Sequence, residues 1–533
     1  MALLLVAATV VGACGDDDGD DAGAGGSATT QSSTAGGDTT AGASTTAAED
    51  VDPDGVLRVG VDLAASGGLK FDPIKMATGQ YIYSTPVLRS LLMRDETGAL
   101  VPDLAESAEV VDPTTVTATL RPNLRFSDGT PLDAAAVKAT VERNIASNNS
   151  AGLQVADLAL IESVTADSPT ELTITMKQPA AAVAYALLAG VEFAPVSPAT
   201  YAAAATGDGT TVVGAGPMMI ESYTPNASVK MVRNPNYHDP DSVTLGGIEY
   251  VNSQPGPSMV NALRSGAIDY VVVTTDQSNG LTSGYEVDQH TMTAGMTFQW
   301  CMQEGQPLGN AQVRQAISYA IDREAYNEAI YAGRSEVAWD LWPESSPWHD
   351  PSLEGVYERD VAKARQLLAE GGYPDGFSFT MMVTPATTRD MEVLQAQLAE
   401  IGVEMQLIAT TNPLDYYVDK KMDATYSQSR PGLDKLPRFY LSNSFSNVCK
   451  FPSPQADALY AQITALAPDD PEAIELQRQF SQLVVRDLAW FPMTVFQQHI
   501  VAYDGERVGE LDFYYDQLGG RQPDPIGTTI RQG

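Results

Sequence analysis

The spacing of apolar and polar residues changes along the chain, from strand-like alternation in its first part to helical spacing in its second. Residues 115–121 (TVTATLR) and 171–177 (ELTITMK) alternate with a period of two, which predicts strands of a sheet with one wet face. Between them, Asp133 can cap a helix over 134–147. Residues 52–62 (DPDGVLRVGVD) predict a turn followed by a strand. The first part of the chain therefore reads as strand-rich, with a small α+β unit.

The pattern beyond residue 200 predicts a hairpin and then an alternation of helices and strands. Two strand candidates, 218–223 and 227–233, flank Thr224-Pro225-Asn226, which suits a turn. Past Thr297 the apolar residues take helical spacing, and Gly333 stands where a C-cap glycine would end a helix over 311–332. The next expected elements are a helix ending at Gly371-Gly372, a strand over 376–383, a helix closed by Gly402, a strand over 403–409 and a helix over 471–490. This order is an α/β pattern.

The first fifty residues have the composition of an export signal followed by a tether. Residues 1–13 (MALLLVAATVVGA) are too few to span a bilayer but suit the apolar part of a signal peptide. Val11-Gly12-Ala13-Cys14 is similar to a lipobox, so we expect 1–13 to be a lipoprotein signal peptide and Cys14 to carry lipid. The alternative is a buried N-terminal strand with a chance cysteine. With eight acidic residues and no basic one, 15–50 predicts a disordered Gly/Ser/Thr linker, so 14–50 form a lipidated tether.

Composition describes a large, acidic, folded protein. A length of 533 residues suggests about three or four domains. The hydrophobic fraction of 44% is ample for large cores. A net charge of −37 would repel phosphates over most of the surface, which argues against nucleic acid as a partner. No run after the first fifty residues is long and apolar enough to cross a bilayer.

The motifs that usually mark catalysis or a cofactor are missing. The chain contains no H-E-x-x-H, C-x-x-C, P-loop or G-x-S-x-G motif, and its four histidines lie far apart. We therefore expect no metal, no cofactor and no enzymatic activity. If Cys14 is lipidated, Cys301 and Cys449 remain and could form one disulfide outside the cytoplasm, although their spacing does not decide this.

Eight local sequences, in order along the chain, resemble the family 5 extracytoplasmic solute-binding proteins, which are the dipeptide- and oligopeptide-binding subunits of ABC importers. They are 57–62 (LRVGVD), 100–107 (LVPDLAES), 119–143 (TLRPNLRFSDGTPLDAAAVKATVER), 214–223 (GAGPMMIESY), 229–237 (VKMVRNPNY), 262–269 (ALRSGAID), 313–325 (VRQAISYAIDREA) and 364–377 (ARQLLAEGGYPDGF). The resemblance covers nearly all of residues 55–505. Most of these residues have turn or strand roles, so we expect them to be scaffold.

The resemblance implies an α/β fold of the type II periplasmic-binding-protein kind, with two lobes, mixed sheets and an extra α+β subdomain. The division it implies is lobe I from 51–85, 206–298 and 491–533, the inserted subdomain from 86–205, and lobe II from 299–490. The chain would cross between lobes at 297–302 (TFQWCM) and 490–496 (WFPMTVF). Hinge closure would then enclose a ligand between the lobes.

Seven side chains are candidate ligand contacts, because aromatic faces supply apolar area and charged groups fix a ligand's ends. They are Tyr81, Tyr83, Trp300, Trp339, Trp342, Tyr426 and Arg430. A core role is the alternative for each aromatic residue. Family members that bind peptides commonly present an acid in the segment matching 424–434 (ATYSQSRPGLD), and this chain has Arg430 about there. Arg430 would favour a carboxylate, or would form a salt bridge with Asp434 or another acid.

The function that the resemblance implies is a lipid-anchored, extracytoplasmic receptor on the cell membrane. As a monomer it would deliver a small solute, such as a short peptide or a peptide-like molecule, to an ABC permease in the membrane. A secreted, membrane-anchored hydrolase and a ligand sensor without transport remain the alternatives. The sequence leaves the solute open among peptides, other nutrients, metal chelates and haem.

Overall fold

The computed structural model describes residues 51–63, 69–76, 80–95, 98–147, 155–205, 211–254, 256–384, 387–410, 412, 414–428, 437–444, 446–489, 493–515 and 521–532. The chain separates into two units, Met1–Ala48 and Glu49–Gly533, and the description below concerns the second. Cys14, Arg430 and Trp490 lie outside the described residues, as do the whole predicted signal peptide and tether. The expected lipidation of Cys14 stays a prediction.

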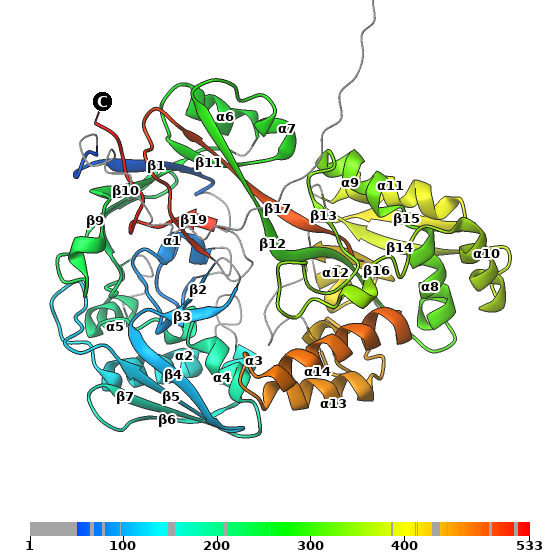
Figure 1. The fold of residues 1–533 in the computed structure, drawn as a ribbon, viewed down its shortest axis with the longest axis horizontal. Helices are drawn as coiled ribbons and strands as arrows, with labels where there is room; N and C mark the ends of the chain where they lie inside the picture. The colour runs from blue at the N-terminus through cyan, green and yellow to red at the C-terminus, as the bar shows by residue number, and fades with distance from the viewer. Residues whose placement is uncertain are drawn as a thin grey trace, which may run out of the picture. The chain divides into compact units, whose positions relative to one another are not determined.

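One mixed sheet runs through most of the described part of the second unit (Figure 1). Its order is β15-β14-β16-β12-β17-β11-β1-β10-β9-β8, with β13 pairing β17 off this path. The strands are β1 (Val56–Val61), β8 (Met218–Thr224), β9 (Ser228–Arg233), β10 (Gly247–Asn252), β11 (Tyr270–Val273), β12 (Tyr285–Trp300), β13 (Glu336–Val337), β14 (Phe377–Val383), β15 (Val403–Ala409), β16 (Ala424–Gln428) and β17 (Met493–Asp504). The expected hairpin is confirmed as β8 and β9, which pair antiparallel.

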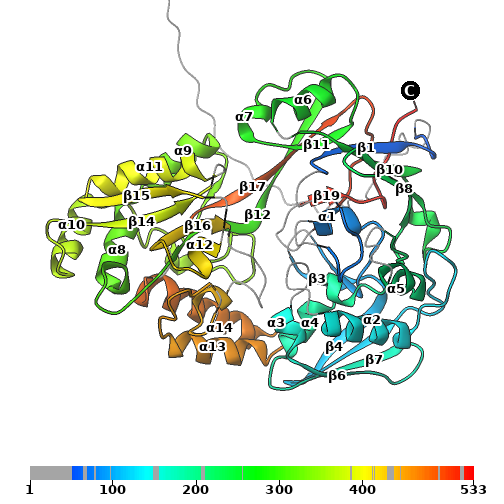
Figure 2. The same ribbon diagram turned by 180° about the vertical axis from the view of Figure 1, so that it is seen from behind.

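The long strands β12 and β17 connect the two ends of this sheet and lie side by side in both views (Figure 1, Figure 2). They pair antiparallel from Tyr285 opposite Asp504 to Thr297 opposite Met493. The register shifts between Thr291 and Gly295 and again between Gly295 and Thr297. Such irregularities bend and twist a ribbon locally, so we expect the strand pair to bend at this point.

A second sheet, ordered β4-β5-β7-β6, belongs to the segment between β1 and β8. Its strands are β4 (Ala105–Asp112), β5 (Thr115–Leu120), β6 (Ile161–Ala166) and β7 (Glu171–Met176), and its helices are α2 (Ala134–Ser147), α3 (Val155–Leu158), α4 (Ala181–Leu187) and α5 (Pro198–Ala205). The strands β2 (Leu92–Arg94) and β3 (Leu100–Pro102) precede it. Asp133 caps α2 as expected, because its Oδ1 accepts the backbone N–H of Ala136 at 2.9 Å.

The second half alternates helices with strands, and in one place the sequence prediction was wrong. The helices are α8 (Ala311–Ala320), α9 (Arg323–Tyr331), α10 (Val361–Glu370), α11 (Thr388–Ala399), α12 (Leu414–Tyr417), α13 (Pro454–Thr464) and α14 (Pro471–Gln482). The single helix expected over 311–332 is two helices. Ile321 leaves the helical conformation, and the Asp322 side chain accepts the N–H of Ala325 to cap α9. The helix expected over 471–490 ends at Gln482 and continues as a π-helix over Leu483–Asp487.

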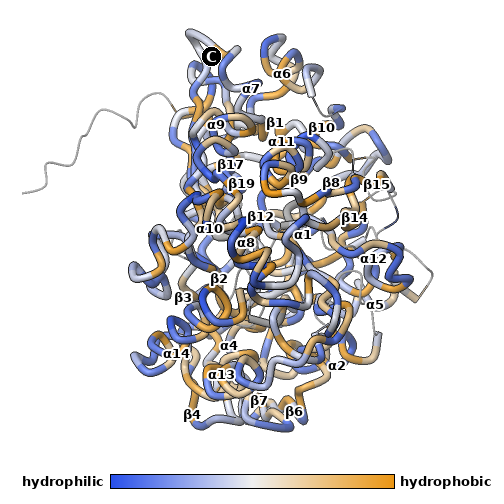
Figure 3. The backbone as a smooth tube through the Cα atoms, turned by 90° about the vertical axis from the view of Figure 1, so that its right-hand side faces the viewer, coloured by the Kyte–Doolittle hydropathy of each residue, from blue (hydrophilic) through white to orange (hydrophobic). Residues whose placement is uncertain are grey.

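Two large hydrophobic cores are formed by different parts of the chain. The first core gathers residues from Leu57 to Tyr270 and adds Val501, Val508 and Ile530. The second core gathers residues from Met296 to Phe496. Figure 3 shows hydrophobic and hydrophilic residues interleaved within the elements, as expected where each buries one face. Among the described residues, no helix is both long and apolar enough for a bilayer crossing. The seven-segment division into lobes stays a prediction.

Candidate ligand-binding site

Two of the aromatic candidates lie inside the second core. Trp300, at the end of β12, is 1% exposed, and its ring stacks on Phe298 with centroids 4.9 Å apart. Tyr426 on β16 is 3% exposed, and its hydroxyl lies 3.0 Å from the Tyr326 hydroxyl and 2.5 Å from Thr494 Oγ1. These surroundings favour a packing role. A ligand-contact role for either residue stays a prediction.

The tryptophans of the segment after α9 also have protein partners. Trp339 is half-buried, with the guanidinium carbon of Arg323 5.0 Å from its ring centroid. Trp342 is 1% exposed and packs edge-on against Trp348 at 4.6 Å. Its indole N–H is buried and has no hydrogen-bond partner among the described residues. This loop is fixed from within by buried Asp340, whose carboxylate accepts the backbone N–H groups of neighbouring residues.

The two tyrosine candidates near β1 lie on the short helix α1 (Tyr81–Ser84). Tyr83 is half-buried, and its ring meets that of Tyr250 edge-on at 5.3 Å. Burial, with a contribution from Asp62, raises the pKa of Tyr83 to about 12, so its hydroxyl stays protonated at neutral pH. For Tyr81 the structure describes the backbone position alone. A ligand-contact role for Tyr81 and Tyr83 stays a prediction, and a pocket begins at the next residue, Ser84.

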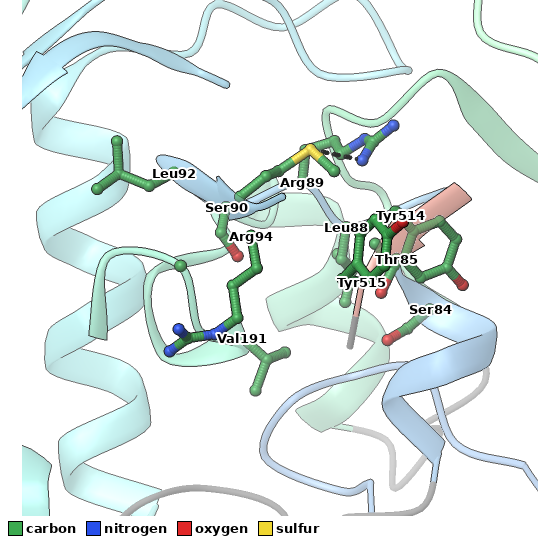
Figure 4. Close-up of a pocket in the computed structure, with 12 residues that line it drawn as sticks. Ser84, Thr85, Leu88, Arg89, Ser90, Leu92, Arg94, Val191, Tyr514 and Tyr515 are labelled. Atoms are coloured by element: carbon green, nitrogen blue, oxygen red, sulfur yellow. Dashed lines mark hydrogen bonds between the residues drawn. The ribbon is translucent and has the colours of Figure 1, made fainter. Parts of the chain in front are cut away.

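This pocket is a small cavity of about 60 Å³ between α1, β2 and the hairpin formed by β18 (Phe513–Tyr515) and β19 (Arg521–Pro523). Ser84, Thr85, Arg94, Tyr514 and Tyr515 are among its lining residues (Figure 4). Hydroxyl groups and a guanidinium thus lie among apolar lining residues such as Leu88, Leu92 and Val191. Sequence reasoning missed the residues after Tyr83, because nothing in their spacing separates them from ordinary loop residues.

A buried charge cluster supports the pocket from behind. Arg89 is 1% exposed, and its Nη2 donates to both carboxylate oxygens of Asp524 at 2.9 Å. Its Nε lies 3.8 Å from Asp103 Oδ2. Burial raises the pKa of Asp103 to about 6, although Arg89 opposes this shift. The cluster ties the strand region after α1 to the C-terminal segment, so we assign it a structural role.

A polar strip lies on the face of β12 and β16 that Trp300 and Tyr426 do not occupy. Gln299 donates from Nε2 to Ser427 Oγ at 2.5 Å and accepts at Oε1 from the Tyr417 hydroxyl at 3.0 Å. The Tyr416 hydroxyl donates to the carbonyl oxygen of Gln299 at 2.8 Å. The strip runs along β16 toward Gln428, two residues before Arg430, which lies outside the described residues. The alternation of polar and apolar residues in 297–301 (TFQWC) is the sequence signal that could have predicted this polar strip.

Charged and titratable side chains also meet where β18 and β19 lie against β12 and β17. His290 and His499 are opposite each other in the register of β12 and β17. Burial, reinforced by Arg521, lowers the pKa of His499 to about 4, and burial also lowers the pKa of His290. Arg521 Nη1 donates to Asp288 Oδ2 at 3.0 Å. Sequence analysis treated these histidines as isolated, because 208 intervening positions separate strands that the fold brings together.

The structure bonds the sulfurs of Cys301 and Cys449, with the two Cα atoms 5.0 Å apart. Cys301 directly follows β12, and Cys449 lies in the loop before α13. Among the residues that the structure describes, no three His, Cys, Asp or Glu side chains gather in a way that could hold a metal ion. The candidate regions described above offer hydroxyl, amide and guanidinium groups and aromatic rings.

Known relatives match a large part of the chain. The profile of the bacterial extracellular solute-binding proteins, family 5 Middle, matches residues 99–448. The glutathione-binding protein GsiB of Escherichia coli (strain K12) is 31% identical over 313 residues. That alignment covers 57% of this chain and 60% of GsiB, so the chain spans about three fifths of the length of this relative.

Solved structures show the same fold over nearly the whole described chain. The periplasmic binding protein DppA from Helicobacter pylori, in complex with the peptide STSA, is 19% identical with a TM-score of 0.73, covering 90% of this chain and 98% of that one. NikA from Staphylococcus aureus, in complex with Ni(L-His)2, is 20% identical with a TM-score of 0.69, covering 89% and 100%. The expected type II binding-protein fold with mixed sheets is confirmed. The chain belongs to the bacterial extracellular solute-binding proteins of family 5.

Proposed function

We propose that this chain is the extracytoplasmic solute-binding lipoprotein of an ABC importer. It captures a small polar solute, a short peptide or a peptide-like molecule, and delivers it to a membrane permease. The names of its relatives support this class of solute, since GsiB is a glutathione-binding protein and DppA is seen with a peptide. Lipid attachment at Cys14 would keep the receptor close to the permease.

The observation that carries the proposal is the pair of strands that joins the two cores. β17 has residues in both cores, Val501 in the first and Val495 and Phe496 in the second. β12 pairs with β17 and contributes Met296, Phe298 and Trp300 to the second core. The register shifts at Thr291–Thr297 give this two-strand connection a place to twist. Two cores joined by such a connection can close over a solute and open again, which converts binding into a change of shape.

Identification of the bound solute tests the proposal most directly. Protein purified without a refolding step is denatured, and the released small molecules are identified by mass spectrometry. Calorimetry with the identified compound, with glutathione and with a tetrapeptide then measures affinity. We expect about one solute per chain, returned chemically intact after long incubation. Consumption of the solute would establish the hydrolase alternative, and the absence of any bound or binding solute would refute the proposal.

We propose that Arg430, in the second half of the chain, contacts a carboxylate group of the solute. Arg430→Ala should weaken solute binding by about tenfold or more, since a desolvated guanidinium makes strong charge-assisted bonds. The melting temperature should change little. Arg125→Gln is the matched control, because Arg125 is exposed and donates to the carbonyl of Gly129 far from this segment. Unchanged affinity in Arg430→Ala would reject the assignment.

A further inference from the structure

Arg521 is a buried arginine whose hydrogen-bonding capacity is only partly used. It opens β19, opposite Tyr515 in the β18–β19 register, and its side chain is 8% exposed. Nη1 donates to Asp288 Oδ2 at 3.0 Å, and the guanidinium carbon lies 4.4 Å from the ring centroid of Phe513. Nε and Nη2 are buried, and neither has a hydrogen-bond partner among the described residues. Such unsatisfied donors are rare in protein interiors and call for an explanation.

The two nitrogens without partners form one chemical unit. Nε–H and the neighbouring N–H of Nη2 point in the same direction along one edge of the planar guanidinium. This edge can donate to both oxygens of a carboxylate at once, a charge-assisted bidentate contact that is among the strong ones in proteins. Asp288 occupies a different corner, at Nη1. Within the described part of the chain, the arrangement therefore leaves a complete bidentate donor edge without an acceptor.

The groups around Arg521 add donors and neutral rings. His499 Nδ1 accepts the backbone N–H of Arg521 at 3.3 Å, so the proton of its neutral ring is on Nε2. His290 lies across the strand pair from His499, with its ring 5.5 Å from that of Tyr515. The Tyr270 hydroxyl donates to the carbonyl oxygen of Arg521. Since burial keeps both histidines neutral near pH 7, the charges in contact are Arg521 and Asp288, and Asp288 is 40% exposed.

The pocket beside α1 is lined by residues of β18, the strand that pairs with β19 where Arg521 lies. Tyr515, the register partner of Arg521, lines the cavity of about 60 Å³ together with Ser84 and Thr85 (Figure 4). Since a water molecule occupies about 30 Å³ in the liquid, this cavity has room for roughly two waters. A carboxylate group is of that size.

We propose that the Nε and Nη2 edge of Arg521 is a receiving site for a carboxylate of the bound solute. This assignment rests on the proposed function and narrows it to solutes with a free carboxylate placed beside β12 and β17. The β18–β19 hairpin then contributes to the choice of solute. The bound carboxylate would lie between this hairpin and the strands β12 and β17. Asp288 competes for the same guanidinium, so its charge limits the affinity for the anion.

The first experiment uses acetate, so it does not depend on the identity of the solute. Thermal unfolding at pH 7 is followed in rising sodium acetate, with sodium chloride keeping the ionic strength constant. We expect acetate to raise the melting temperature of the wild type with half-saturation in the millimolar range. Arg521→Gln should abolish this response, and Asp288→Asn should lower the half-saturating concentration severalfold. Arg125→Gln, with the same loss of charge at an exposed position, should behave as the wild type.

The test stays decisive because Arg521→Gln and Asp288→Asn are expected to change the acetate response in opposite directions. If Arg521→Gln fails to fold, Asp288→Asn still decides, because removing the competing carboxylate must strengthen the response. An acetate response equal in wild type and Asp288→Asn, or retained in Arg521→Gln, would overturn the inference. A second arm compares the identified solute with its methyl ester. The site is supported if the wild type binds the acid about tenfold more tightly than the ester and the Arg521→Gln variant loses this preference. Equal affinities of the wild type for acid and ester would refute the site and leave the proposed function intact.

Discussion

Removal of the disulfide between Cys301 and Cys449 should destabilise the protein mainly through its unfolded state. The bond joins residues 148 positions apart. In the chain-entropy treatment, a loop of that length restricts the unfolded chain by about 5 kcal/mol at 25 °C, and removal of native disulfides costs about 2–5 kcal/mol. The folded loop keeps other supports, since the buried Asn447 side chain donates to the carbonyl of Phe451 at 2.7 Å and to that of Leu441 at 3.1 Å. Cys301→Ser combined with Cys449→Ser should therefore fold but unfold more easily.

The size of the thermal effect also reports which part of the chain unfolds together. If the second core unfolds alone as a unit of about 200 residues, a loss of 4 kcal/mol lowers the melting temperature by about 8–16 °C. Cooperative unfolding of the whole chain would give a smaller shift, since the unfolding entropy grows with the number of residues. Calorimetry of the oxidised wild type, the reduced wild type and the double variant measures this. Superimposable traces for all three, or labelling of both thiols in unfolded, unreduced protein, would refute the reasoning.

Three further predictions concern single side chains. The pKa of His499 is about 4 in the folded protein and about 6.5 in the unfolded chain, so its neutral ring stabilises the folded state fully above pH 6.5. This contribution to the free energy of unfolding falls by up to about 3 kcal/mol as the pH drops to 4. Melting curves recorded at several pH values should show the loss, and the His499→Gln variant should lack it. Ala332→Gly should stabilise the protein by about 1 kcal/mol, because Ala332 ends α9 with a φ of +52°, which glycine adopts more easily. Ala329→Gly, inside the same helix, should instead destabilise the protein by about 1 kcal/mol. If urea unfolding gave changes in stability of the same sign for both variants, the reasoning would be contradicted. Tyr426→Phe should cost about 1–2 kcal/mol without changing solute affinity, and a tenfold loss of affinity at constant stability would restore the ligand-contact role.

Local elements were predictable where the residues that define them are neighbours in sequence. Asp133 and the helix after it are an example, because a cap needs contact with a backbone N–H three residues away. The helix over 311–332 was predicted wrongly for the same reason. Its apolar positions continue past Ile321, but the side chain of Asp322 offers the backbone a competing hydrogen bond that starts a new helix.

Amino-acid order alone predicted several strands and helices, such as β5 and α2, and, through eight local resemblances, the family to which the chain belongs. It could not decide whether Trp300 and Tyr426 face a ligand or a core, because the same aromatic spacing serves both. Only the tertiary structure sets Tyr426 between Tyr326 and Thr494 and brings Arg521 against Asp288, partners 233 positions away. Burial and hydrogen-bond partners depend on which strands become neighbours, and pairing over such distances is decided by packing of the whole sheet, not by local pattern.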